Sequence, residues 1–169
     1  GDVSVELWNT LIHNPEDWFA AMVNAFASKA PGIAWLGQFF VPVGRFFGSI
    51  EFGLLLSVLL VQLITVFLTY RIGTIITHQS AVLPVLGAVF VASAPLFIGM
   101  SHQYLTEALQ LFSTAYVYWV AVVSPSHAPL RGLAHLVLAA TIGLLAKISS
   151  PMYFLFPFCI AGYYLARRI

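Results

Sequence analysis

Residues 52–70 read FGLLLSVLLVQLITVFLTY. This stretch is predominantly apolar, carries no charge, and lies between Glu51 and Arg71. A helix needs roughly 20 mostly apolar residues to cross the hydrocarbon core of a bilayer. The stretch therefore predicts a membrane-spanning helix.

The composition of the whole chain indicates the same environment. Of its 169 residues, 60% are apolar and 8% are charged, and the mean hydropathy is +0.93. Water-soluble domains carry about 25% charged residues, so a soluble fold is excluded. The 7 Lys and Arg nearly balance the 6 Asp and Glu, and no basic cluster offers a surface for nucleic acid.

Polar turns and prolines divide the rest of the chain into further apolar segments. They cover residues 81–100, 106–123, 132–149 and 151–167, and in the second of them the uncharged part is 108–123. Proline inside a membrane helix is tolerated, because neighbouring helices satisfy the freed carbonyls. We therefore predict an all-α fold, a polytopic transmembrane helix bundle of about five spans.

Basic residues determine the expected orientation. Five spans bring Arg71, Arg131 and Arg167–Arg168 to one side, which the excess of Lys and Arg in cytoplasmic loops identifies as cytoplasmic. The acidic residues then lie on the other side, namely Asp2, Glu6, Glu16, Asp17, Glu51 and Glu107. We expect a multi-pass protein of a plasma membrane or ER-type membrane, with its functional site on the non-cytoplasmic face.

The first segment, residues 1–51, is expected to be an outer loop with amphipathic helices. Residues 14–17, Asn-Pro-Glu-Asp, have the pattern of a helix start. Apolar residues follow at helical spacing, at Trp18, Phe19, Met22, Val23 and Phe26. This pattern predicts a helix in the outer interface, and residues 33–43 are expected to form a second interfacial or re-entrant piece.

Acidic residues on the outer side are candidates for catalysis. Asp2 and Glu6 lie one helical turn apart, and they are either part of a solvated terminus or include a carboxylate general base. Glu107 either favours the positive end of a helix dipole or belongs to a site with its neighbours His102 and Tyr104. A metal site built from Asp2, His102 and Glu107 requires that the loops converge.

Two lysines and one tryptophan complete the candidates. Lys147 stands on the side that the orientation disfavours for a cation. It either extends to the head groups or neutralises an anionic ligand such as the phosphate of a lipid donor. Lys29 has the same two interpretations, and Trp35 either anchors the interface or stacks on a sugar ring.

A series of motifs follows one order along the chain. It comprises Asp2, the element Lys29-Ala30-Pro31, the turn Phe47-Gly48, the acid Glu107, and Gly143-Leu144-Leu145-Ala146-Lys147 followed by Pro151. This order resembles the polytopic glycosyltransferases of the GT-C superfamily, nearest to the dolichyl-phosphate-mannose-protein mannosyltransferases and the aminoarabinose transferases. The chain departs from the family at Val3, where a second acid is usual, and at Gly32, where a second proline is usual.

The resemblance implies a reaction and a set of roles. A polyprenyl-phosphate-linked sugar would be the donor, and a hydroxyl of a lipid, glycan or protein would attack it with inversion of the anomeric centre. Asp2 would deprotonate that hydroxyl, and Lys147 with Lys29 would bind the donor phosphate. Glu107 would orient the acceptor or help to hold a divalent metal ion, the one cofactor left open. Because the family is longer, the chain is expected to be the N-terminal membrane part of a larger enzyme.

A non-enzymatic polytopic membrane protein is the alternative, either a transporter fragment or a structural subunit of a complex. It explains the spans and the orientation equally well. A transporter is expected to carry polar residues or broken helices at mid-membrane depth, for which Pro84 and Pro95 are the hints. The alternative gives no reason for the acids and Lys147 to gather on one side.

Overall fold

The computed structural model describes residues 2–25, 31–78, 80–101, 106–123 and 129–166. Within these residues the chain is all-helical and contains no strand, which confirms the predicted all-α class. The helices are α1 (Asp2–His13), α2 (Pro15–Asn24), α3 (Gly32–Gly37), the 3-10 helix η2 (Gln38–Phe40), α4 (Val41–Phe46), α5 (Ile50–Thr77), α6 (Val82–Ser93), α7 (Pro95–Ser101), α8 (Thr106–Val123), α9 (Pro129–Ala146) and α10 (Pro151–Ala166).

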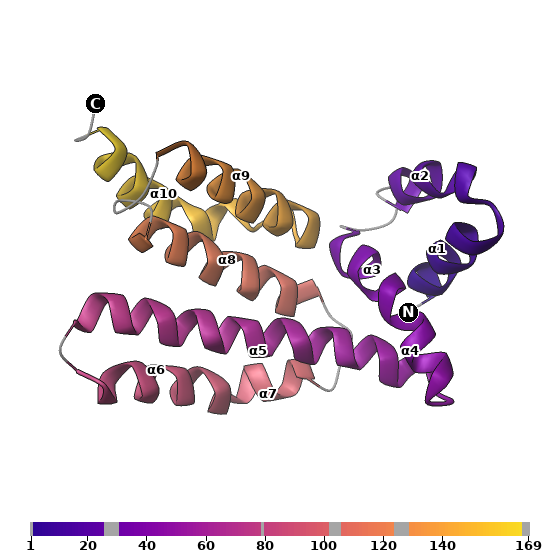
Figure 1. The fold of residues 1–169 in the computed structure, drawn as a ribbon, viewed down its shortest axis with the longest axis horizontal. Helices are drawn as coiled ribbons and strands as arrows, with labels where there is room; N and C mark the ends of the chain where they lie inside the picture. Colours follow the sequence, from indigo (N-terminus) through magenta and orange to yellow (C-terminus); the bar gives the residue numbers. More distant parts are fainter. Residues whose placement is uncertain (1, 26–30, 79, 102–105, 124–128, 167–169) are drawn as a thin grey trace.

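The helices form two parts (Figure 1). Helices α1 to α4 make an outer unit at one end of a bundle that α5 to α10 build. In the bundle, α5 packs against α6 and α8, and α8 packs against α9 and α10. Successive long helices run in opposite directions, so the starts of α5, α8 and α10 all lie at the end of the outer unit.

One described helix, α5, is long and apolar enough to cross a membrane. Its 28 residues extend about 42 Å at 1.5 Å per residue. The other apolar helices among the described residues are shorter, at Val82–Ser93, Arg131–Ala146 and Pro151–Ile160. The count of five spans therefore stays a prediction.

Two predicted segments differ from the helices in the structure: one is divided, and the other ends earlier. Segment 81–100 is divided into α6 and α7, because Ala94 is extended with ψ 130°. Pro95 has no N–H and disfavours a helical conformation at the preceding residue, which accounts for the break. The expectation of one helix over 132–149 is wrong in its last turn, since α9 ends at Ala146. A turn then leads to Pro151, which opens α10.

Large apolar side chains cover the outside of the bundle. They include Leu59, Leu63 and Phe67 on α5, Leu83, Leu86 and Phe90 on α6, Leu133 and Val137 on α9, and Met152, Leu155 and Phe156 on α10, all exposed. Soluble monomers rarely expose apolar patches larger than a few hundred Å². An exposed surface of this composition is typical of helices that face lipid.

Buried polar side chains inside the bundle are satisfied by backbone carbonyls. Gln62 is 3% exposed, and its Nε2 donates to the Phe97 carbonyl at 2.8 Å. Thr65 donates to the Val61 carbonyl within its own helix at 2.8 Å. A buried polar group is costly unless it is hydrogen-bonded, so these contacts allow polar residues on the helix face that packs against α7 and α8.

Helices α4 and α5 cross with their backbones in contact. The chain turns at Gly48, where φ is +76°, and Ser49 caps α5 by accepting a hydrogen bond from the Phe52 N–H at 3.3 Å. Above the turn, Gly53 of α5 lies against Gly44 of α4. A Cβ on Gly53 would lie 2.4 Å from the Phe40 carbonyl oxygen and 2.7 Å from the Gly44 nitrogen.

We expect Gly53→Ala to destabilise the protein, because backbone atoms cannot give way to the added methyl group. Overpacking of this kind costs about 1–3 kcal/mol, which lowers the thermal midpoint by about 2–4 °C per kcal/mol in a chain of this size. Gly87→Ala on α6 is the matched control, since a Cβ there meets no atom within 4 Å. Equal midpoints for the two variants in detergent would contradict the close crossing.

Candidate functional site

The outer ends of α8 and α9 bring two of the predicted site residues together. The Lys147 Nζ lies 2.9 Å from the Glu107 Oε1, and the side chains are 45% and 39% exposed. Thr106 donates a hydrogen bond to the second carboxylate oxygen at 3.3 Å. These partners come from the start of one helix and from the residue after the end of another, so the pair links the start of α8 to the end of α9.

The ion pair favours the ionised form of Glu107, which precedes the apolar run of α8. The hydrogen bond from Lys147 lowers the pKa of the Glu107 carboxyl group, whereas desolvation by partial burial raises it, and the net direction is down. A carboxyl group with a lowered folded-state pKa contributes stability above its unfolded pKa. That contribution is lost as the pH falls through the folded-state pKa.

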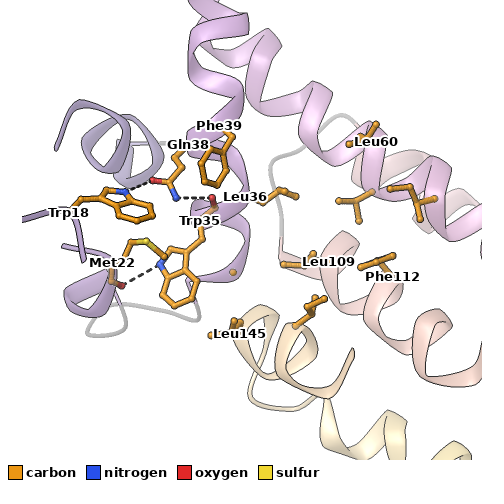
Figure 2. Close-up of a pocket in the computed structure, with 14 residues that line it drawn as sticks. Trp18, Met22, Trp35, Leu36, Gln38, Phe39, Leu60, Leu109, Phe112 and Leu145 are labelled. Carbon is orange, nitrogen blue, oxygen red and sulfur yellow. Dashed lines mark hydrogen bonds between the residues drawn. The ribbon is translucent and has the colours of Figure 1, made fainter. Parts of the chain in front are cut away.

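A cavity of about 460 Å³ lies between the outer unit and the bundle (Figure 2). Its lining is apolar apart from one amide side chain and two indole nitrogens. The outer unit contributes Trp18, Met22, Gly32, Trp35, Leu36, Gln38 and Phe39, and the bundle contributes Leu60, Val61, Ile64, Leu109, Phe112, Ile142 and Leu145. Ligand pockets of 300–1,000 Å³ with mostly apolar walls are typical of small-molecule sites.

Hydrogen bonds hold the outer wall of this cavity. The indole Nε1 of Trp18 donates to the Gln38 Oε1 at 2.9 Å, and the Gln38 Nε2 donates to the Trp35 carbonyl at 3.0 Å. The indole Nε1 of Trp35 donates to the Met22 carbonyl at 3.2 Å. Because these polar atoms are paired within the wall, the surface they leave towards the cavity is apolar.

The ion pair and the cavity lie at the same ends of α8 and α9, but on different faces of the two helices. Leu109 and Leu145 line the cavity, two residues from Glu107 and Lys147 respectively. Gln110 and Ser149 continue the polar contacts at these helix ends, at 3.5 Å.

Of the remaining predicted site residues, the structure describes Trp35, Asp2 and Glu6. Trp35 lies in the cavity wall, as described above. Asp2 and Glu6 are exposed on α1 and do not line the cavity, and within the described residues no hydrogen bond or ion pair links them to Glu107 or Lys147. The predictions for Lys29, His102 and Tyr104 concern residues outside the described ranges.

The predicted metal site includes His102, which lies outside the described residues. In the ranges that the structure describes, His, Cys, Asp and Glu side chains nowhere gather in a group of three or more. The Glu107 carboxylate already has an ammonium group as its partner. The divalent metal ion therefore stays a prediction.

Sequence reasoning missed the cavity and Gln38. The signal available was a glutamine in an otherwise apolar stretch that also contains Trp35. Gln38 is fully buried, yet its partner Trp18 lies on a different helix, and that contact has no signature in local sequence.

Comparison with known proteins gives no family assignment. No protein-family model matches the chain, and neither the curated proteins nor the solved structures give a match.

We expect the pKa of Glu107 to rise in Lys147→Gln, because the neutral amide removes the main stabilisation of the carboxylate while desolvation stays. The measurement is an NMR pH titration of ¹³C-labelled glutamate carboxyl groups in nanodiscs, with the Glu107 signal assigned through Glu107→Gln. The same pKa in the parent and in Lys147→Gln would contradict the ion pair.

Proposed function

We propose that the chain is a membrane glycosyltransferase that moves a sugar from a polyprenyl-phosphate donor to a hydroxyl group at the outer membrane face. One observation carries the proposal: a lysine–carboxylate pair stands at the same ends of α8 and α9 that contribute Leu109 and Leu145 to an apolar cavity of about 460 Å³. A donor of this class combines an anionic phosphate with an apolar chain, and the two features offer one partner for each. The resemblance to GT-C transferases supports the same reading.

Lys147 is the proposed ligand of the donor phosphate. An ammonium group has three donors, and one of them serves Glu107, so the others are free to meet phosphate oxygens. In this arrangement Glu107 holds the lysine in place and is less suited to be the base. Its lowered pKa makes it a weak proton acceptor.

The proposed reaction is a single displacement. The acceptor oxygen forms a bond to the anomeric carbon, while the bond from that carbon to the phosphate oxygen breaks and its electron pair stays on the phosphate. The resemblance to GT-C transferases assigns the proton of the acceptor hydroxyl to Asp2, and Lys147 stabilises the charge on the leaving phosphate. One substitution inverts the anomeric centre.

The proposed setting is a bundle of five spans with the outer unit on the non-cytoplasmic face. Support comes from the alternating helix directions and from Arg71 and Arg131, which lie at the ends of their helices remote from the outer unit. The exposed apolar side chains of α5, α6, α9 and α10 support it as well.

Cysteine labelling in sealed vesicles tests this topology. In a Cys159→Ser background, we expect Thr74→Cys, close to Arg71, to react with an impermeant reagent from one side. We expect Thr106→Cys to react from the other side. Labelling of both positions from the same side would refute the arrangement.

Transfer measured against donor concentration tests the proposed function. A charge-assisted contact to phosphate contributes roughly 1.5–3 kcal/mol, so we expect Lys147→Gln to lower donor use by about tenfold to a hundredfold. Asp2→Asn should reduce turnover more than donor binding, with Glu6→Gln as its neighbouring control. Equal donor use by Lys147→Gln and the parent would contradict the role of Lys147 in binding the phosphate.

A pair of tryptophan variants tests the cavity in the same assay. Leu60 and Leu59 are neighbours on α5 with exposures of 45% and 44%, and only Leu60 lines the cavity. We expect Leu60→Trp to fill part of the space and raise the donor KM, and Leu59→Trp to leave it unchanged. An equal rise of the donor KM in both variants would show that the cavity does not bind the donor.

The helix break at Ala94 favours a transporter as a second candidate. Discontinuous helices line the substrate sites of many transporters. Here, however, the carbonyl of Phe97 after the break is already bound by Gln62, and the side chains of this contact are uncharged. Transport of a solute without any glycosyl transfer would favour this second candidate.

A further inference from the structure

The turn after α9 decides where Lys147 points. Helix α9 ends at Ala146, and the Lys147 N–H makes the last helical hydrogen bond, to the Gly143 carbonyl at 2.9 Å. The chain then reverses, and the Ser150 N–H donates to the Lys147 carbonyl at 3.0 Å. Lys147 is therefore the first residue of a tight turn that Ser150 closes.

The Ser150 side chain locks this turn from inside. It is fully buried, and its hydroxyl donates to the Gly143 carbonyl at 2.7 Å, the same oxygen that accepts from the Lys147 N–H. One carbonyl of α9 thus holds both ends of the turn. Phe154 packs over Gly143, where a Cβ would lie 2.2 Å from the ring, so the locked turn is also covered by α10.

We propose that Ser150 is a positioning residue, which fixes the backbone at Lys147 so that its ammonium group meets Glu107 and the donor phosphate. The contact between Lys147 and the donor phosphate rests on the proposed function. The contact between Lys147 and Glu107 does not, because the structure shows it directly. Lysine has several rotatable bonds and loses much rotamer freedom when it is held, so a fixed backbone reduces the range that its ammonium group can reach.

Ser150→Ala removes the hydroxyl and keeps the rest of the turn. We expect the Glu107 carboxyl pKa to rise towards its ordinary value, and kcat/KM for a polyprenyl-phosphate sugar to fall several-fold. Ser150→Thr retains a hydroxyl at the same position and should restore both quantities. The readouts are the ¹³C titration of Glu107 in nanodiscs and transfer against donor concentration.

Ser57→Ala is the matched control. Ser57 is also fully buried, and its hydroxyl also donates to a backbone carbonyl, that of Leu54 at 2.6 Å, but it lies on α5 and takes no part in the turn. A purely structural effect of losing a buried hydroxyl would be the same in both alanine variants. The positioning role therefore requires that the Glu107 pKa moves in Ser150→Ala and stays in Ser57→Ala.

The two readouts separate the positioning role from the proposed function. An unchanged Glu107 pKa in Ser150→Ala, or an equal change in Ser57→Ala, overturns the positioning role. A raised Glu107 pKa in a chain that transfers no sugar supports the positioning role and removes the transferase.

Discussion

The outer unit and the bundle meet backbone to backbone at Gly32, and the cavity depends on this contact. A Cβ on Gly32 would lie 2.9 Å from the carbonyl carbon and oxygen of Leu145 and 2.9 Å from a methyl group of Leu109. With hydrogen in its place, α3 can lie directly on the end of α9. The indole of Trp35, three residues further along, then faces Leu145 and Leu109 across the open space (Figure 2).

Apolar runs and the turn residues between them made much of the fold predictable. Segment 106–123 corresponds to α8, and the turn at Phe47-Gly48 separates α4 from α5. The break at Ala94 was not predicted, because proline within an apolar run is compatible with a continuous or a broken helix. Its outcome depends on neighbouring helices, here on α5, whose Gln62 binds the Phe97 carbonyl.

The candidate site was predictable as residues but not as an arrangement. Glu107 and Lys147 were both selected from sequence, with separate roles on acceptor and donor, and the structure makes them partners across 40 residues. The cavity could not be predicted from the sequence, because its walls come from helices as distant in sequence as α2 and α9. Sidedness brings residues to one face of a membrane protein, and side-chain packing then decides which of them touch.

The partner of Lys147 also changes the argument about its position. The predicted orientation places Lys147 on the side where cations are disfavoured, and a bound phosphate would explain that position. Glu107 neutralises Lys147 locally, so the orientation alone does not require an anionic ligand. Both side chains are more than a third exposed, and ion pairs of this kind add little stability. Under the proposed function the carboxylate has a different use. A bare lysine would retain the polyprenyl-phosphate product, whereas an adjacent negative charge weakens that attraction and favours release after transfer. The pair then offers donors to the phosphate in the reaction while keeping the local charge near zero before and after it.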